Sequence, residues 1–372
     1  RDFCLSRGLG DVYKRQSLIY GRSSFFSVAL PLARPGIIAG LALVLMETVS
    51  DFGTVEYFAL ETLTLGVFNV WLGMNSLSGA SQISSVLFVF VVVLLTIEYL
   101  ARRNQRFHEK SSGQNMLESK ETSNFKKVVC FTVCTIPIVI GFVIPVSILL
   151  NFVFSGFSII DFTQIFYTSF FSITLALVGA FFVMLASIFL ILISQYKSNN
   201  FQKSLIFLAS CGYALPGTIL AVGMVIFLGW INKYLHLHLS YVAGGFIVLI
   251  FAYVVRFLAV GNASIRSGIL KIHPNAMDAS LTMGAGFYRG VKVVIMPLIL
   301  SNILIGGILV FVDILKELPI TLLLRPFNFE TLATYVYQYA SDELLQESSF
   351  AALIIVVVGS VSYTHLRAHE TG

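Results

Sequence analysis

The chain has 372 residues, of which 57% are hydrophobic and only 12% are charged, and it carries a net charge of +5. A soluble domain carries about 25% charged residues, so the composition excludes an ordinary soluble protein and predicts an all-α, polytopic transmembrane helical bundle surrounded by membrane lipid. The modest positive charge fits cytoplasmic Lys and Arg side chains, and it gives no reason to expect nucleic acid as a partner.

The two ends differ from the rest. Residues 1–16 and 362–372 change abruptly in composition beside apolar segments. Both resemble translated adapter sequence, and we expect them to be non-native and the protein to extend further at both ends. Genuine polar tails are the alternative. Residues 1–16 lack an apolar core, so they do not read as a signal peptide.

Between these ends, apolar segments alternate with polar ones. Two apolar runs, 37–49 and 83–100, precede a polar and basic stretch at 101–127 without hydrophobic periodicity, which predicts a cytoplasmic linker. Six more apolar segments follow, and all but the last are close to the ~20 residues that a spanning helix needs. They are 128–154, 169–194, 204–230, 241–259, 298–316 and 347–361.

With the linker in the cytoplasm, the alternating segments place the basic stretch 262–297 on the same side, as the positive-inside rule expects. His236 and His238 then lie outside, and two imidazoles alone make a poor metal site. The cysteines have no metal-binding or disulfide spacing, so we expect small buried residues. The pair Pro216-Gly217 interrupts an apolar segment and predicts a break in a helix, serving either as a hinge or as a packing kink.

One polar loop has a distinctive spacing. It carries Asp278-Ala279-Ser280, then Gly284, then Pro297 at the start of an apolar helix. Gly284 permits backbone angles that other residues resist, and Pro297 fits the first turn of a helix, where a missing N–H costs little. The loop is therefore predicted to form a helix, a turn and a second helix against the membrane.

This spacing resembles the coupling loop of ABC-importer permeases, in which Glu-Ala-Ala, Gly and a terminal Pro recur at the same intervals. Here Asp278 replaces the Glu and keeps the carboxylate. The resemblance implies that Asp278 to Gly284 seats in a groove on a separate ATPase. Pro31 matches the end of a second such loop, but Leu18 stands where its Gly is expected, and its acidic end would fall within residues 1–16.

The chain also contains an internal repeat. Three pairs are separated by 266 positions: Pro31 with Pro297, Glu47 with Asp313, and Asp51 with Glu317. After a three-residue insertion, Glu61-Thr62-Leu63 matches Glu330-Thr331-Leu332, and Val67-Phe68 matches Val336-Tyr337. The pattern predicts two parallel repeats: a truncated first copy with two membrane helices at 17–100, and a second copy with six at 128–361.

Four carboxylates recur in this repeat: Glu47, Asp51, Asp313 and Glu317. At about 1.5 Å per residue, Asp51 lies ~30 Å from Pro31 and Glu317 lies ~30 Å from Pro297, near the outer surface. Ionisable side chains at such depth are expensive and usually face a cavity or a partner. They are either candidates for a pathway or outer gate for a cation, or helix-end carboxylates at the interface, with Lys316 as one partner.

Longer stretches extend the resemblance to nearly all of residues 17–361. LMETVSDFGTVEYF, FVDILKELPITLLLRPFNFETLATYVYQYASDE, GYALPGT and YVVRFLAVG resemble double-length ferric-iron permeases of type I ABC importers. That resemblance implies a pore-forming subunit in the bacterial inner membrane. Its implied partners are separate ABC ATPase subunits and a periplasmic or lipoprotein iron-binding protein.

Two alternatives stay open. Thiamine permeases share the double-length design, and an ion-driven secondary transporter would also be an apolar bundle with acidic residues, although it needs no ATPase-docking loop. The sequence has no P-loop, nucleophile elbow or HExxH motif, so we expect a transporter rather than an enzyme, with no cofactor and with ATP hydrolysis in a partner subunit.

Overall fold

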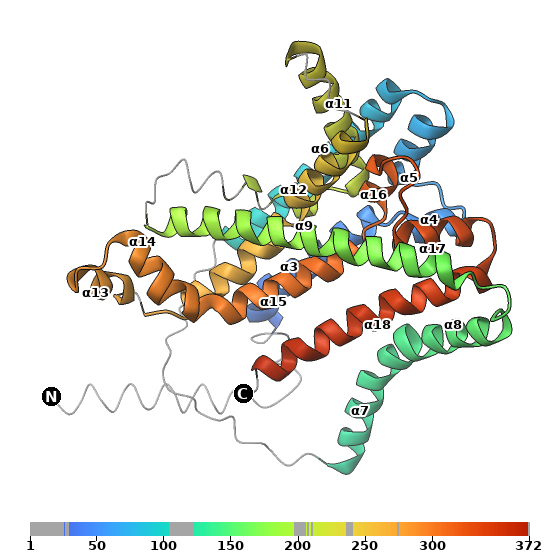
Figure 1. The fold of residues 1–372 in the computed structure, drawn as a ribbon. Helices are drawn as coiled ribbons and strands as arrows, with labels where there is room; N and C mark the ends of the chain where they lie inside the picture. The colour runs from blue at the N-terminus through green and yellow to red at the C-terminus, as the bar shows by residue number, and fades with distance from the viewer. Residues whose placement is uncertain are drawn as a thin grey trace. The chain divides into compact units, whose positions relative to one another are not determined.

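A computed structural model gives the fold (Figure 1). It describes residues 30–103, 123–196, 211–235, 241–273 and 275–370, together with Phe26, Ile206, Leu208 and Ala209. The chain divides into two compact units, one formed by Arg1–Thr48 with Val89–Asn115 and the other by Val49–Phe88 with Met116–Gly372.

The described residues form helices and no strand. The longer helices are α3 (Leu30–Ser50), α6 (Leu77–Arg103), α7 (Asn124–Ile138), α8 (Ile144–Ser155), α9 (Phe162–Tyr196), α11 (Gly217–Leu235), α12 (Tyr241–Leu270), α15 (Met296–Leu315), α17 (Leu332–Ser341) and α18 (Leu345–Glu370). The shorter ones are α4 (Gly53–Tyr57), α5 (Leu63–Phe68), α13 (Ala276–Thr282), α14 (Phe287–Gly290) and α16 (Pro319–Leu324). Three π-helices, η2 (Asn69–Gly73), η3 (Val139–Val143) and η5 (Val291–Ile295), and one 3-10 helix, η4 (Cys211–Ala214), complete the described elements.

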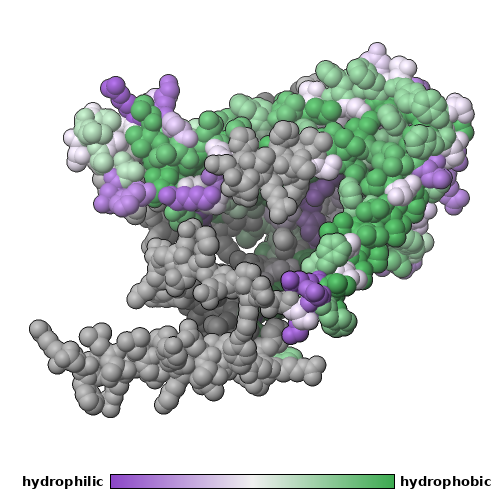
Figure 2. Space-filling view, turned by 90° about the horizontal axis from the view of Figure 1, so that it is seen from below, coloured by the Kyte–Doolittle hydropathy of each residue, from purple (hydrophilic) through white to green (hydrophobic). Residues whose placement is uncertain are grey.

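Six of the described helical stretches are long and apolar enough to cross a membrane. They are Leu77–Ile97, Asn124–Ser155, Phe162–Leu192, Gly217–Tyr234, Gly245–Leu270 and Phe287–Leu315. The stretches Gly36–Ser50 and Leu345–Ser360 are apolar but shorter. Figure 2 views the molecule from below relative to Figure 1. It shows hydrophobic residues over most of the coloured surface, with hydrophilic residues gathered in a few patches. The predicted helical membrane bundle is therefore confirmed.

Individual segments depart from their predicted limits. The segment predicted at 204–230 is not one helix, because η4 ends at Ala214 and α11 begins only at Gly217. The break predicted at Pro216-Gly217 is thus present. Helix α18 runs to Glu370, into the end segment that resembles adapter sequence, while residues 1–16 and both outer histidines fall outside the described part of the chain.

The cysteine expectation was wrong for two residues. Cys130 and Cys134 are exposed on α7, and Cys211 is half-buried. Helix α7 has no buried residue, so an apolar side chain there meets the surroundings rather than a protein core. In a membrane helix, apolar composition alone does not distinguish a lipid-facing position from a buried one.

The core of the larger unit lies among α9, α12 and α15, which contact one another pairwise (Figure 1). Small residues allow the close approach. A Cβ at Gly306 would lie 2.7 Å from the Ser264 side chain, and one at Gly268 would lie 2.9 Å from Asn302. The Ser264 hydroxyl donates to the Asn302 carbonyl at 2.8 Å. Close helix contact through small residues and interhelical hydrogen bonds is typical of membrane proteins, where the hydrophobic effect does not drive helices together.

Matching landmarks appear in the two stretches of the predicted repeat. Thr62 and Thr331 are both extended N-cap residues, and each side chain accepts a hydrogen bond at 3.3 Å, from the backbone N–H of Leu65 and of Thr334 respectively. These threonines are 269 positions apart, the separation on which the sequence match rests. An N-cap side chain satisfies a backbone donor that the helix itself leaves without a partner.

Left-handed residues recur in the same order. Ala59 (φ 53°) and Asn328 (φ 60°) are also 269 positions apart, whereas Asn75 (φ 50°) and Glu343 (φ 61°) are 268 apart. The separation falls from 269 to 268 positions after π-helix η2. The counterpart of η2 in the other stretch belongs to a regular α-helix, α17. A π-turn contains one extra residue, so it accounts for the shift. These landmarks support the repeat, which the sequence predicts.

Aromatic rings join the two stretches. Phe52 is 2% exposed, and its ring centroid lies 4.8 Å from that of Phe68 and 5.6 Å from that of Tyr337. Phe68 and Tyr337 occupy matching positions of the repeat. The ring of Phe52 therefore contacts equivalent side chains from both stretches, close to where they adjoin.

Candidate functional site

The predicted coupling loop folds as a helix, a turn and a second helix. Helix α13 ends at Thr282, Gly284 has a φ of +83°, and α14 begins at Phe287. The N–H of Gly284 donates to the Leu281 carbonyl at 3.0 Å, and the N–H of Ala285 donates to the Ser280 carbonyl at 3.1 Å. This pair of bonds is a Schellman motif, which ends a helix with a left-handed residue, so the turn at Gly284 is the predicted one and needs glycine.

The other residues of the motif are distributed over this loop. Asp278 and Ala279 lie in α13, where Ala279 is exposed, and Ser280 is 3% exposed. Helix α13 contacts η5 and α14, so its buried side is anchored to the helical run that continues into α15. Pro31 lies in the first turn of α3, in the other compact unit.

The exposed surface of this loop includes several large apolar side chains. Four large side chains around Gly284 are exposed: Leu281 (44%), Met283 (83%), Phe287 (46%) and Tyr288 (77%). A cluster of exposed apolar side chains on an otherwise polar loop is typical of an interaction surface. We call these four residues the loop patch.

Pro297 lies in the first turn of α15, as predicted, but the helix does not start afresh there. Helix α15 begins at Met296, with Pro297 in its first turn, but η5 and α14 join it directly in one helical run from Phe287 to Leu315. The N–H of Met296 donates to the carbonyl of Val291 in the π pattern. Because proline lacks an N–H and crowds the preceding turn, the wider π-turn lets the helix continue past it.

The outer pair of acidic residues has a common role in the structure. The Asp51 carboxylate accepts a hydrogen bond from the N–H of Thr54 at 3.4 Å, and the Glu317 carboxylate accepts one from the N–H of Ile320 at 3.3 Å. Each therefore binds the first turn of the short helix that follows, α4 or α16. This arrangement agrees with the interpretation of these residues as helix-end carboxylates. Asp51 and Glu317 occupy equivalent positions of the repeat.

Glu317 has a second partner that the sequence reasoning missed. Its Oε2 atom lies 3.5 Å from Nε of Arg256, and both side chains are at most 8% exposed. The Arg256 Nη1 group donates to the Leu215 carbonyl at 3.2 Å, next to the helix break at Pro216. The available signal was a single arginine inside the apolar segment 241–259, since a buried charge in a membrane helix needs a partner.

The break at Pro216-Gly217 is packed against this ion pair. A Cβ at Gly217 would lie 2.8 Å from Glu317 Oε1 and 2.9 Å from Arg256 Nη1. On the other side of the pair, the Tyr253 and Thr321 hydroxyls are 2.6 Å apart, and Thr321 donates to the Glu317 carbonyl at 2.8 Å. We call these residues the buried polar cluster: Tyr253, Arg256, Glu317 and Thr321.

The inner acidic positions are more accessible. The carboxylate of Asp313 lies 3.0 Å from Nζ of Lys316, whose side chain is 57% exposed. The lysine partner suggested by the sequence is therefore present, for Asp313 rather than for Glu317. Glu47 is exposed on α3, in the other compact unit.

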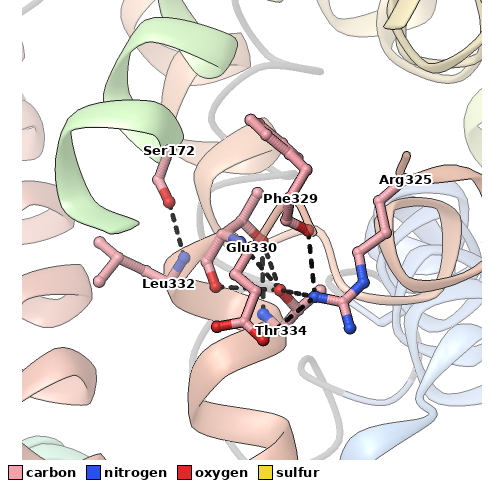
Figure 3. A network of polar contacts seen from close by, with 7 residues as sticks. Ser172, Arg325, Phe329, Glu330, Leu332 and Thr334 are labelled. Atoms are coloured by element: carbon pink, nitrogen blue, oxygen red, sulfur yellow. Dashed lines mark hydrogen bonds and ion pairs between the residues drawn. The ribbon is translucent and has the colours of Figure 1, made fainter. Parts of the chain in front are cut away.

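A second polar network fixes the connection from α16 to α17 (Figure 3). Arg325 Nη1 donates to the Phe329 carbonyl and to the Thr334 hydroxyl, each at 3.2 Å, and lies 3.9 Å from Glu330 Oε1. The backbone N–H of Leu332 donates to the Ser172 hydroxyl of α9 at 2.6 Å. These contacts hold the start of α17 against the core helix α9, so we assign the network a structural role.

Metal and cofactor chemistry has no conventional centre here. Among the described residues, no group of three or more His, Cys, Asp and Glu side chains is placed to hold a metal ion. What the described residues do form is a set of long apolar helices, a buried ion pair beside a broken helix, and an anchored loop with exposed apolar side chains. The class is thus a multi-pass helical membrane protein.

Comparison with known proteins makes the assignment more particular. No family model matches the chain. The Fe(3+)-transport system permease protein FbpB 2 of Haemophilus influenzae is 22% identical to it, over 98% of this chain and 71% of the relative. The ferric transport system permease protein FbpB of Actinobacillus pleuropneumoniae is 19% identical, over 91% of this chain but only 51% of the relative. The predicted resemblance to ferric-iron permeases is confirmed, and it fits a multi-pass protein of the bacterial inner membrane.

Proposed function

We propose that this chain is the permease of an ATP-driven importer of ferric iron, which forms the translocation pathway and is coupled to separate ATPase subunits. The observation that carries the proposal is the Schellman turn at Gly284 with the loop patch around it, in a chain whose relatives are named as ferric-iron permeases. A short helix anchored on one side and apolar on the other is suited to dock into a groove of another subunit.

The proposed coupling follows from how the loop is attached. Helix α13 contacts η5, and the helical run continues from η5 into α15, one of the three core helices. A displacement of α13 by an ATPase is therefore transmitted along a continuous helix rather than through a flexible linker. Rigid-body movement of packed elements is a common way in which such transitions spread.

The acidic residues have a secondary place in this proposal. Asp313 and Glu317 lie at the end of α15 away from the coupling loop, and Glu47 and Asp51 match them in the repeat, so we propose that the four residues shape the entrance. A periplasmic or lipoprotein iron-binding protein would deliver the cargo to that end. Unchanged iron uptake by Glu47→Gln plus Asp313→Asn at matched expression would instead favour a purely structural role for that pair.

Uptake of radioactive iron tests the proposed function. Cells that express the intact permease with its ATPase and iron-binding partner should accumulate ferric iron, and a catalytically inactive ATPase should abolish the accumulation. A protonophore with ATP maintained should leave uptake in place, because an importer driven by ATP does not need an ion gradient. Uptake that survives the inactive ATPase and fails with the protonophore would establish a secondary transporter, and competition by excess thiamine would establish the thiamine alternative.

A further inference from the structure

A small cavity lies between α4 and α17, away from the buried polar cluster. It has a volume of about 290 Å³, and oxygen-bearing side chains line much of it: Glu56, Tyr57, Tyr337, Ser341 and Glu343. Two carboxylates and two phenols thus come together from α4 and from α17 with the turn that follows it; Glu56 is half-buried, whereas Tyr57 and Glu343 are exposed. We call this cavity the Glu56–Tyr337 pocket.

The pocket carries negative charge without a cation of the protein to balance it. Among the described residues, neither Glu56 nor Glu343 forms an ion pair. The Tyr337 phenol interacts with the Glu56 carboxylate, but the Oε2 atom of Glu56 is buried and has no hydrogen-bond partner in the described part of the chain. A buried carboxylate oxygen without a partner is costly, so it indicates a missing donor or cation.

Tyr337 is held as a neutral phenol in this pocket. Burial raises its pKa above the ordinary value for tyrosine, and the hydrogen bond to Glu56 raises the pKa further. The ring also packs against Phe52, which fixes its position. The phenol oxygen is therefore placed beside the Glu56 carboxylate before any ligand arrives.

The repeat shows that the fold does not require these polar residues. Helices α4 and α16 begin 266 positions apart, and at this separation Leu322 corresponds to Glu56. The equivalence is structural, because the N–H of Glu56 bonds the Phe52 carbonyl and the N–H of Leu322 bonds the Leu318 carbonyl.

On the other side of the pocket, Phe68 occupies the position that matches Tyr337. The equivalent places in the other copy are therefore apolar. The pocket pairs Glu56 of the first copy with Tyr337 of the second, whereas the pair at the equivalent positions, Leu322 and Phe68, carries neither a carboxylate nor a phenol, which points to a ligand rather than to a structural need.

The pocket also lies at the proper end of the protein for an incoming cargo. The coupling loop lies just before α15, whereas α16 and α17 come after α15. The 20 residues of α15, about 30 Å of helix, therefore separate the loop from the end of the bundle where the pocket lies (Figure 1). If the loop faces the cytoplasm, as the basic residues predict, the pocket faces the outer compartment.

We propose that the Glu56–Tyr337 pocket binds the cargo itself, a hard trivalent cation, as it is received at the outer mouth; this inference rests on the proposed function. Hard cations take oxygen ligands, and the pocket offers carboxylate oxygens from Glu56 and Glu343 with phenol oxygens beside them. When the oxygen of Tyr337 bonds Fe³⁺, the phenol proton leaves to water, and no electron is transferred. Water fills the remaining positions of the metal, so the site holds its cargo briefly and can release it inward.

Equilibrium binding to the purified intact permease tests the site without ATPase or receptor. Fe³⁺ supplied as its citrate complex should be retained and should give the visible charge-transfer band of iron bound to a phenolate. Glu56→Gln and Glu343→Gln should each weaken retention by at least about tenfold. Tyr337→Phe should abolish the band. Asp342→Asn, which removes an exposed carboxylate next to Glu343 but outside the pocket, should bind as the wild type does.

The outcomes separate this inference from the proposed function. If the wild type imports iron, but its Fe³⁺ retention and band are the same in all three pocket variants, the site is wrong and the function stands. If the wild type retains no Fe³⁺ against citrate, the site is likewise wrong. If the pocket variants lose binding and the permease imports no iron in cells, the cation site stands and the proposed function fails. Thermal unfolding at the wild-type temperature shows that each variant is folded.

Discussion

Glu317 combines three interactions in one buried residue. Its carboxylate pairs with Arg256 and binds the first turn of α16, and its backbone carbonyl accepts from Thr321. Replacing Glu317 by Gln removes the charge and leaves Arg256 buried without a counter-ion. Breaking a buried pair in this way costs about 3–5 kcal/mol, so we expect a large drop in the unfolding temperature in detergent.

Asp313→Asn provides the control for this prediction. The Asp313 carboxylate pairs with a lysine that is 57% exposed, and exposed pairs contribute at most about 1 kcal/mol. Its unfolding temperature should therefore stay close to that of the wild type. Equal losses in the two variants would show that the Arg256–Glu317 pair is solvated and contributes no more than a surface pair.

Gly217 is required for a different reason, which is space. An added methyl group would lie within 3 Å of both Glu317 Oε1 and Arg256 Nη1. Gly217→Ala should therefore separate the ion pair and lower the unfolding temperature. Gly223→Ala in the same helix is the matched control, because no atom lies within 4 Å of its added Cβ, and Ala favours a helix over Gly by up to about 1 kcal/mol. An unchanged unfolding temperature in Gly217→Ala would mean that the helix break can shift to make room for the methyl group.

At the scale of elements, two of the three described π-helices are each followed by a helix with proline in its first turn. Helix α8 follows η3 and has Pro145 in its first turn, just as α15 follows η5 and has Pro297. In both places the π-turn allows a helix to pass a residue that normally ends it. The sequence shows the prolines, but it does not show whether packing makes the chain stop, kink or widen. The position of Pro297 in the first turn of α15 and the break at Pro216 were predicted correctly, whereas the continuous run from η5 into α15 was not.

The coupling loop is the element whose geometry the sequence predicted most closely. Since Gly284 has a φ of +83°, valine there costs about 1–2 kcal/mol of local strain, whereas asparagine tolerates the left-handed region. Both side chains have room, because no atom lies within 4 Å of a Cβ at this position. We predict that Gly284→Val abolishes iron uptake and reduces co-purification of the ATPase, at near-normal expression.

Gly284→Asn separates conformation from side-chain bulk. If the left-handed turn is what matters, Asn should retain most of the uptake and the ATPase association that Val loses. Normal uptake with Val would mean that the loop is not the coupling element. Equal loss with Val and Asn would mean that the ATPase contacts this position directly and excludes any side chain.

At the scale of the whole molecule, apolar segment lengths were enough to predict the helical bundle, and offsets in the sequence were enough to predict the repeat. Pairings between distant segments were not predictable. Arg256 with Glu317 and Glu56 with Tyr337 each depend on how helices pack, and a single sequence gives no contact information between them. The same reason explains why the four acidic residues were treated as one group, although Glu317 is buried and Asp313 is half-buried.

Orientation in the membrane is the prediction that links the loop to the pocket. Two highly exposed residues mark the opposite ends of the pore helix: Met283 (83%) beside the coupling loop, and Phe327 (98%) between α16 and α17. In a background with the four native cysteines replaced, Met283→Cys should react with a membrane-impermeant maleimide only in inside-out vesicles. Phe327→Cys should react only in intact spheroplasts. Added ATPase should protect Met283→Cys and leave Phe327→Cys reactive, because only the loop patch is proposed to dock. Labelling with the sides reversed would place the basic stretch 262–297 outside, where no ATPase reaches it, and the proposed coupling would be wrong.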